Sequence, residues 1–326
     1  MEFEECDTQY RTRFSEMSLT SDGLRFLKLR TLIDIEPLKI STSLRESLCL
    51  GTATVKRTQL TEIRKRLYND RSFTPESLDR LLKTTYSEIL NASPVDTSSL
   101  KDALRDISEN GDQYWSAWNS IYRDDIRQHI QHQFVRTVNI QNYEDLLQKI
   151  DSLLNPVVKG YVVISWYNQW SSTLIERLFM SHHNVIPTAR RIDKVDFFFS
   201  DIPVDLKVTF LPDGYMRDLI KRHLINRVGD AVEFLINNRL DLAKWLYENQ
   251  GEPRFSDSHR LFLTLVDVNN INNSWKLKSS FELIETKVNE YLDSANTIPM
   301  LNWTFRGDKI SGDFATHTDV LLITNA

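Results

Sequence analysis

Cysteine and glycine are both scarce in this chain. Only Cys6 and Cys49 occur among 326 residues, and neither has a partner at a spacing typical of metal ligands. Two thiols cannot build a disulfide framework, so reduced and structurally minor cysteines are expected. The nine glycines form no glycine-rich phosphate loop, and no G-x-S-x-G motif of a serine hydrolase is present. The sequence therefore gives no support for ATP use or for serine-based hydrolysis.

Long apolar runs are missing as well. The longest uncharged apolar stretch lies near 161–166, which is far shorter than the roughly 20 residues that a membrane-spanning helix needs. The chain starts with several acidic residues between Met1 and Asp7, whereas a signal peptide starts with a basic segment and continues with an apolar one. We therefore expect a cytoplasmic protein with no membrane partner.

A net basic charge is the third absence, because the formal charge is -5. A protein that simply coats nucleic acid is normally basic overall, so the composition disfavours a histone-like binder. It does not exclude a nuclease, which has a cluster of acidic metal ligands and needs basic residues only along the DNA-facing cleft. The hydrophobic content of 41% is sufficient for one large or two ordinary globular domains.

The sequence pattern changes near residue 150. Before it, helical signals dominate, and strand signals are few. Thr74 followed by Pro75 is typical of a helix start, with an N-cap residue and a proline at the first helical position. Apolar residues at helical spacing predict helices over 60–67, 78–90 and 112–134. We therefore expect residues 1–150 to form a mainly helical region for DNA recognition or dimerisation.

After residue 150 the pattern indicates an α/β domain that extends to residue 326. A short apolar, β-branched run at 157–165 precedes a helical stripe that contains Leu174 and Leu178. Two strands are expected at 194–199 and 204–210, joined by a short turn. Further elements are expected as helices over 215–245, a strand at 261–268, a helix at 281–292 and a strand at 319–324. This order predicts a mixed β-sheet core flanked by helices.

The second strand of the expected hairpin has an unusual charge pattern. Side chains alternate between the two faces of a strand, so Asp205 and Lys207 share one face while Leu206 and Val208 share the other. An antiparallel hairpin can bring Asp196 towards Asp205. Two neighbouring carboxylates are costly unless something compensates their charge, and a hard divalent cation such as magnesium is the natural partner.

A chance occurrence of this pattern has to be weighed against the catalytic interpretation. The chain contains a second acid-x-lysine pattern at Glu285 and Lys287, which lies in a helical stretch and is expected to line a solvated helix face. Asp205 and Lys207 differ because they lie in a β-branched, aromatic run that follows another strand-borne aspartate. A salt bridge on an edge strand is the structural alternative for this pair.

The arrangement resembles the PD-(D/E)XK nuclease superfamily, and type II restriction endonucleases in particular. Asp196 matches the first acid of the motif, with Val195 in place of the nominal proline. Asp205 and Lys207 match the (D/E)-x-K element, with aspartate in place of the more frequent glutamate. Glu176 lies on the preceding helix, where many members have an additional acid. The resemblance covers about residues 160–211 and implies a restriction-endonuclease-like fold, whereas residues 1–150 resemble no known family.

The resemblance implies a role for each motif residue. Asp196, Asp205 and the backbone carbonyl of Leu206 would hold Mg²⁺ against the scissile phosphate of double-stranded DNA. Lys207 would position the attacking water, and Glu176 would complete a second metal site or tune the first. Cleavage at a specific short site, a homodimer that matches a palindromic site, and a cognate DNA methyltransferase in the same system are further expectations of the type II resemblance.

Other polar residues are candidates for DNA contact. Arg190, Arg191 and Lys194 precede the first motif acid, and Arg64 and Lys65 belong to the densest basic patch of the N-terminal region. Each set could instead be a solvated surface.

The pair His182 and His183 could be mistaken for metal ligands. Adjacent side chains on a helix or strand point apart, so phosphate contact or plain surface is the preferred interpretation. Two rival functions remain for the whole chain. One is a superfamily nuclease of low sequence specificity in repair or defence. The other is a non-catalytic helical DNA-binding or interaction module in which the acidic hairpin is merely structural.

Overall fold

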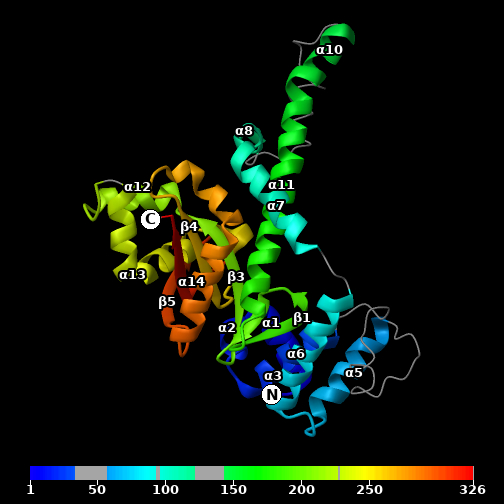
Figure 1. Cartoon of the computed structure of the whole chain (residues 1–326). Coiled ribbons are helices and arrows are strands. Elements are labelled where there is room, and N and C mark those ends of the chain that lie inside the picture. Colours follow the sequence, from blue (N-terminus) through cyan, green and yellow to red (C-terminus); the bar gives the residue numbers. More distant parts are fainter. Residues whose placement is uncertain (34–56, 93–95, 122–142, 227, 326) are drawn as a thin grey trace. The chain divides into compact units, whose positions relative to one another are not determined.

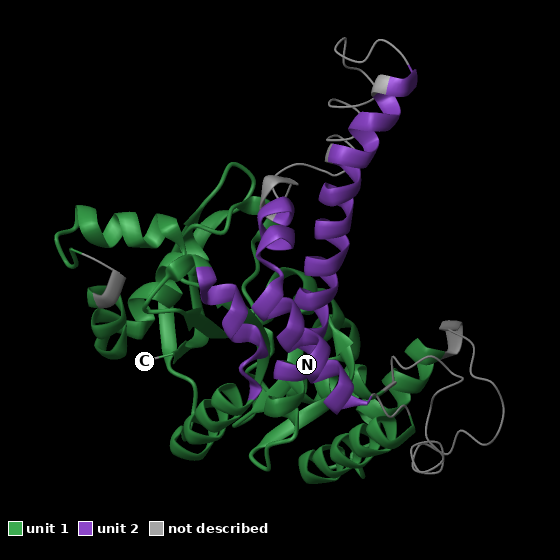
Figure 2. Ribbon diagram, turned by 45° about the horizontal axis from the view of Figure 1, so that its top comes forward, with its two compact units in different colours: residues 1–94, 176–272, 282–326 green, residues 95–175, 273–281 purple. Residues whose placement is uncertain are grey.

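The computed structural model describes residues 1–33, 57–92, 96–121, 143–226 and 228–325 (Figure 1). These residues form two compact units. The first contains residues 1–94, 176–272 and 282–326, and the second contains residues 95–175 and 273–281 (Figure 2). Residue 150, near which the sequence pattern changes, lies inside the second unit.

The N-terminal part of the first unit is helical, as the sequence predicts. Thr74 accepts a hydrogen bond from the N–H of Ser77 at the start of the α6 helix, so it acts as the expected cap in front of Pro75. The 60–67 and 78–90 predictions are confirmed by two longer helices. The helices of this part are α1 (Phe3–Thr12), α2 (Phe14–Met17), α3 (Ser21–Ile33), α5 (Arg57–Asn69) and α6 (Pro75–Ala92).

These helices share a hydrophobic core with the first strands of the sheet. Phe14 and Phe26 from the helices and Leu82 from α6 are buried together with Val195 and Phe198 of the second strand. Helices α3 and α6 both contact the first strand. The N-terminal helices of this unit therefore pack on the same sheet that has the candidate site residues.

The second unit is also helical in its described residues. Asp96 caps its first helix by accepting hydrogen bonds from the N–H groups of Ser98 and Ser99. Trp275 is buried at its centre, stacked on Trp115. The elements are α7 (Thr97–Asn110), α8 (Asp112–Ile121), α10 (Tyr143–Lys149), the π-helical turn η3 (Ile150–Leu154), α11 (Asn155–Met180), whose last turn belongs to the first unit, and most of the 3₁₀ segment η5 (Ile271–Ser279).

Two sequence-based expectations change in this part of the chain. The helix predicted over 112–134 is confirmed to Ile121, and 122–134 lie outside the described residues. The apolar run at 157–165 is part of the long helix α11. Its β-branched residues are tolerated because helix propensity differs by only about 0.7 kcal/mol per residue among ordinary amino acids, and tertiary packing outweighs that.

The sheet is mixed and has six strands in the order β1-β2-β3-β4-β6-β5. The outer pairs are antiparallel, while β3 pairs with β4 and β4 with β6 in parallel. The strands are β1 (Val185–Ile192), β2 (Val195–Phe199), β3 (Ile202–Phe210), β4 (Arg260–Val266), β5 (Met300–Arg306) and β6 (Ser311–Thr324). An α/β protein with an N-terminal helical region and a mixed sheet flanked by helices is thus confirmed, although β1 and β5 were not predicted.

The β2–β3 hairpin closes more tightly than expected. Ser200 and Asp201 alone form the turn, with φ of 50° and 59°, while the predicted turn residues Ile202 and Pro203 already belong to β3. Positive φ at both central residues suits the twist of a two-residue hairpin loop. Phe197 pairs with Val204 in this register, and Asp196 and Asp205 are the next residues along the two strands.

The remaining helices connect and cover the parallel strands. Residues of α12, α13, β4, β5 and β6 form a second core that includes Leu219, Leu242, Tyr247 and Trp303. The connecting elements are α12 (Asp213–Lys221), α13 (Val228–Glu248), the 3₁₀ turn η4 (Glu252–Arg254) and α14 (Phe281–Ser294). Within the described ranges, none of the helices combines the length and apolar character that a membrane crossing requires.

Candidate active site

Asp205 and Lys207 of β3 lie on the same face of the strand, as the alternation of side chains predicts. The Lys207 Nζ is 2.7 Å from the Asp205 Oδ1. The aspartate side chain is 10% exposed and the lysine side chain is 48% exposed. The acid is therefore fixed inside the protein while the ammonium reaches it from the solvent side.

Asp196 of β2 is the neighbour of this pair. Its Oδ2 accepts a hydrogen bond of 2.8 Å from the backbone N–H of Leu206. Burial and the negative charge of Asp205 raise the pKa of Asp196 to about 6, although the Leu206 N–H and the charges of Lys207 and Arg191 act in the opposite direction. The two carboxylates therefore lie close enough to repel one another, as the hairpin argument predicts.

Glu176 is buried in the last turn of α11 and binds Arg191 of β1. The Arg191 Nε donates to the Glu176 Oε1 over 2.9 Å, and its Nη2 pairs with the other carboxylate oxygen. The same guanidinium lowers the pKa of Asp196 through its charge. Glu176 is thus linked to the motif acids through Arg191, for which the sequence had suggested DNA contact or a solvated surface.

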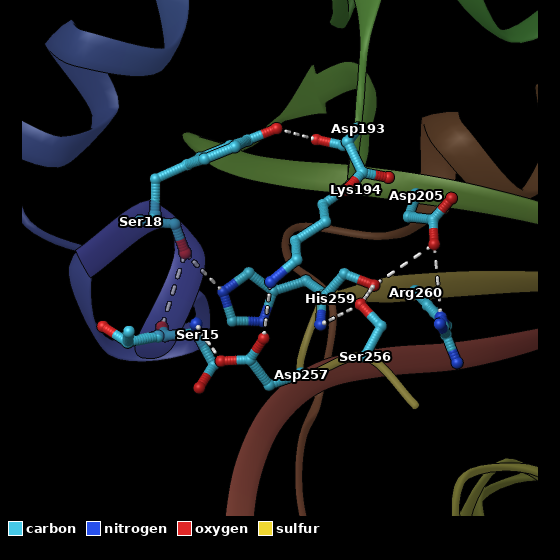
Figure 3. Close-up of polar contacts among 12 residues, drawn as sticks. Ser15, Ser18, Asp193, Lys194, Asp205, Ser256, Asp257, His259 and Arg260 are labelled. Carbon is cyan, nitrogen blue, oxygen red and sulfur yellow. Dashed lines mark hydrogen bonds and ion pairs between the residues drawn. The ribbon is translucent and has the colours of Figure 1, made fainter. Parts of the chain in front are cut away.

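Two further groups hold Asp205 from β4 and the segment before it. The Asp205 Oδ2 accepts hydrogen bonds from the Ser258 Oγ and the Arg260 Nε, each over 3.2 Å (Figure 3). Arg260 is buried, donates to the Gln250 Oε1 over 2.6 Å and lies over the Tyr247 ring. Sequence analysis missed Ser258 and Arg260, because only the parallel register of β3 and β4 brings Arg260 beside Asp205.

A second buried network lies beside the first. Lys194, expected as a DNA contact, forms an ion pair of 3.0 Å with Asp257, and Asp257 also accepts the backbone N–H of Ser15 (Figure 3). His259 bonds the Ser18 hydroxyl through Nε2 over 2.9 Å (Figure 3) and accepts the backbone N–H of His317 at Nδ1. These contacts join the α2 region to the sheet.

The other basic candidates lie on two elements. Lys65 of α5 pairs with Glu4 over 2.6 Å, and Arg64 next to it is half-buried. Arg190 is exposed on β1 beside Arg191. A DNA-binding role for Arg64, Lys65 and Arg190 stays a prediction.

The oxygen donors of the site suit a hard dication. Asp196 and Asp205 provide carboxylate oxygens, and the Leu206 carbonyl belongs to the same strand segment, which is the type of donor set that Mg²⁺ uses. Burial first and the negative charge of Asp205 second raise the pKa of Asp196, and a dication beside the carboxylate would act in the opposite direction. A dication at Asp205 would compete with the exposed Lys207 at Oδ1, because Oδ2 is held by the buried Arg260.

The second acid-x-lysine pattern and the histidine pair both lie outside this group of residues. Glu285 and Lys287 lie on α14, where Lys287 pairs with Glu290 on the solvated face, as expected. His182 and His183 depart from expectation, because their ring centroids are only 4.4 Å apart. They lie in the turn after α11 rather than on a helix or strand, so the argument that adjacent side chains point apart does not apply.

Comparison of the chain with protein-family models, with curated proteins and with solved structures finds no match. Its function therefore has to be inferred from the residues themselves and their geometry.

Proposed function

We propose that this chain is a magnesium-dependent nuclease that hydrolyses phosphodiester bonds of double-stranded DNA. The observation that supports it most is the meeting of Asp196, Asp205 and Lys207 on two paired strands, with the lysine 2.7 Å from one acid. This is the spatial counterpart of the acid and acid-x-lysine elements by which the sequence resembles the PD-(D/E)XK superfamily.

The electrostatics of Asp196 also favour a metal-binding role over a purely structural one. A structural carboxylate normally lies where its partners lower its pKa, because that stabilises the folded protein. The pKa of Asp196 is raised to about 6 instead. Perturbed carboxylates of this kind are common at functional sites, where a cation or a proton completes the arrangement.

The roles follow from position and charge. Mg²⁺ bound by Asp196, Asp205 and the Leu206 carbonyl would supply the positive charge that phosphodiester hydrolysis requires at the phosphate. Lys207, half-exposed and next to the acids, would orient the attacking water. Arg260 and Ser258 would fix the Asp205 carboxylate, and Arg191 would place Glu176 at the edge of the site.

Site-specific cleavage, as in type II restriction endonucleases, is the form of this function that we propose. The sequence resemblance over 160–211 supports this form. A homodimer and a cognate DNA methyltransferase are part of the same proposal. Recognition of a palindromic site by two symmetry-related subunits is the physical reason to expect the dimer.

The test is to incubate the purified full chain with long unmethylated DNA, in Mg²⁺ or in EDTA. The parent protein is compared with Lys207→Ala and with Lys287→Ala, which removes the lysine of the other acid-x-lysine pattern. Both lysine side chains are nearly half exposed, at 48% and 44%, so neither change should unfold the protein. We expect Lys207→Ala to lose about 100-fold or more of the rate, because a misplaced attacking group costs about that much, and Lys287→Ala to keep it.

Each pattern of products decides between the candidate functions. Discrete fragments that need Mg²⁺ and disappear in Lys207→Ala support a site-specific endonuclease. A smear with the same dependence retains the catalytic centre and favours a nuclease of low specificity in repair or defence. Intact DNA over varied substrates contradicts the nuclease proposal and favours a DNA-binding or interaction module.

A further inference from the structure

A separate group of possible metal ligands lies at the end of α11. His182 and His183 in the turn and Asp293 near the end of α14 each present one ligand atom, and these three atoms all lie within 4.8 Å of one another. The His182 Nε2 is 3.2 Å from the Asp293 Oδ1, and the His182 side chain is only 7% exposed. None of these residues belongs to the network around Asp205.

The backbone around the group is fixed by several hydrogen bonds. His182 donates its N–H to Phe179 and accepts that of Val185, both over 3.1 Å. The Asn184 side chain donates to the Leu292 carbonyl over 3.1 Å, which holds the turn against α14 beside Asp293. The Lys83 Nζ donates to the His183 carbonyl over 3.0 Å. The backbone positions of the three residues are thus held close together by contacts that do not depend on a metal.

The geometry and the donor types fit zinc better than magnesium. Two imidazoles and one carboxylate are typical zinc ligands, whereas magnesium prefers oxygen donors and waters. Two ligands about 2.05 Å from a tetrahedral ion are separated by about 3.3 Å, close to the 3.2 Å between His182 and Asp293. Without metal, the His182 Nδ1 accepts the Asn184 N–H over 3.3 Å, so Nε2 carries the proton towards Asp293. A zinc ion on Nε2 would require the ring proton to move to Nδ1, so the long hydrogen bond from the Asn184 N–H would be lost.

A pocket of about 310 Å³ adjoins the two histidines, which line it together with Lys83 and Tyr86. The Tyr86 hydroxyl is buried and has no hydrogen-bond partner among the residues that the structure describes. A buried hydroxyl without a partner is costly, and this one belongs to a residue of the pocket wall. The pocket also leaves room for a fourth zinc ligand, and the Lys83 ammonium favours an anionic one.

We infer that His182, His183 and Asp293 bind a zinc ion whose fourth position faces this pocket and takes water or a small anion. The site is distinct from the proposed magnesium centre and independent of nuclease activity. Three protein ligands with one open position is the arrangement of zinc sites that act on a bound ligand rather than sites that only stabilise a fold.

The test is equilibrium dialysis of the metal-stripped full chain against Zn²⁺, with bound metal counted per chain. His183→Ala and Asp293→Asn are the test variants. Glu290→Gln is the matched control, because Glu290 lies on the same helix and is 59% exposed, against 60% for Asp293. Asp205→Asn shows whether any of the bound zinc occupies the proposed magnesium centre instead. Unchanged circular dichroism establishes that each variant is folded.

We expect one tightly bound zinc in the parent protein, in Glu290→Gln and in Asp205→Asn. His183→Ala and Asp293→Asn should each weaken binding by at least about tenfold, because loss of a residue that merely orients a metal ligand already costs about that much. Cobalt in the same site should give the visible absorption of a tetrahedral complex. Absence of zinc from the parent protein, equal binding by all variants, or loss of zinc in Asp205→Asn alone would each overturn the assignment.

Discussion

Arg260 and Asp205 form a buried ion pair across two parallel strands. The Arg260 Nε lies 3.2 Å from the Asp205 Oδ2, and the two side chains are 8% and 10% exposed. The pair lies in one row of the sheet, because Asp205 of β3 is the register partner of Arg260 of β4. A guanidinium in this position offsets the cost of burying the carboxylate and also fixes its orientation.

Replacing Arg260 by methionine should therefore destabilise the protein strongly. Among the residues that the structure describes, the change leaves the buried Asp205 with the exposed Lys207 as its remaining cationic partner, and it removes the bond to Gln250. Breaking one side of a buried pair costs about 3–5 kcal/mol, which urea denaturation would measure.

The matched control is Arg306→Ala. Arg306 pairs with Asp313 at the surface, where the two side chains are 62% and 81% exposed. An exposed pair of this kind contributes about 0–1 kcal/mol. Equal losses in the two variants would show that Arg260 does not compensate a buried charge.

His259 should make the protein lose stability as the pH falls. Burial, together with the neighbouring His317, lowers the pKa of His259 to about 3, although Asp257 raises it. A histidine with a lowered folded-state pKa contributes stability that is complete above its unfolded pKa of about 6.5 and is lost as the pH falls towards about 3. Between pH 6.5 and pH 5 the loss from this group is about 2 kcal/mol, at 1.36 kcal/mol per pH unit.

The measurement is the difference in unfolding free energy between the parent protein and His259→Gln, at pH 7 and at pH 5. Glutamine can still bond Ser18 but does not titrate, so its deficit relative to the parent should shrink by about 2 kcal/mol at pH 5. Titration of all other groups cancels in this comparison. A deficit that is the same at both pH values contradicts the assignment of a neutral, buried His259.

Local pattern was enough to predict the hairpin and the position of Asp205 and Lys207 on one face of its second strand. Both follow from the two-residue period of a strand and from a β-branched, aromatic run, and these signals lie within 194–210. Helix α14 and the exposed position of Lys287 followed in the same way from helical spacing.

The contacts that complete the site could not be predicted, because they depend on long-range register. Arg260 lies 55 positions from Asp205 in the sequence and meets it only through the parallel pairing of β3 with β4. Strand β1 was missed because Pro187 and the two arginines at 190 and 191 weaken its strand signal. In the structure β1 does pair with β2, with a shift in register between Pro187 and Ile192. Because β1 was missed, the ion pair between Arg191 and Glu176 was missed as well.

Asp196→Asn should stabilise the protein at alkaline pH while it removes activity. Burial and Asp205 raise the folded-state pKa of Asp196 from 3.8 to about 6. A raised carboxyl pKa favours the protonated folded state, so this group's contribution to stability is present at low pH and is lost as the pH rises through about 6. Asparagine has no charge to bury and can still accept the Leu206 N–H.

Thermal unfolding in the absence of divalent metal checks this prediction. The variant should melt above the parent protein at pH 8, and the two should converge as the pH falls below the ordinary pKa of 3.8. Added Mg²⁺ should raise the melting temperature of the parent protein alone, because a ligand stabilises only the state that binds it. A variant that is less stable than the parent at pH 8 would contradict the repulsion between Asp196 and Asp205.

The rate of DNA cleavage should fall on the acid side of about pH 6. Magnesium needs the ionised form of Asp196, whose pKa is raised to about 6, so at subsaturating Mg²⁺ the rate should drop about tenfold per pH unit well below that value. Arg191 lowers the pKa of Asp196 through its positive charge. Removal of that charge in Arg191→Gln should raise the pKa of Asp196 further and move the acid limb to higher pH, whereas Arg190→Gln on the same strand should leave the limb in place. Single-turnover cleavage between pH 5 and pH 8 measures all three profiles, and an acid limb that does not move in Arg191→Gln would show that a group other than Asp196 controls it.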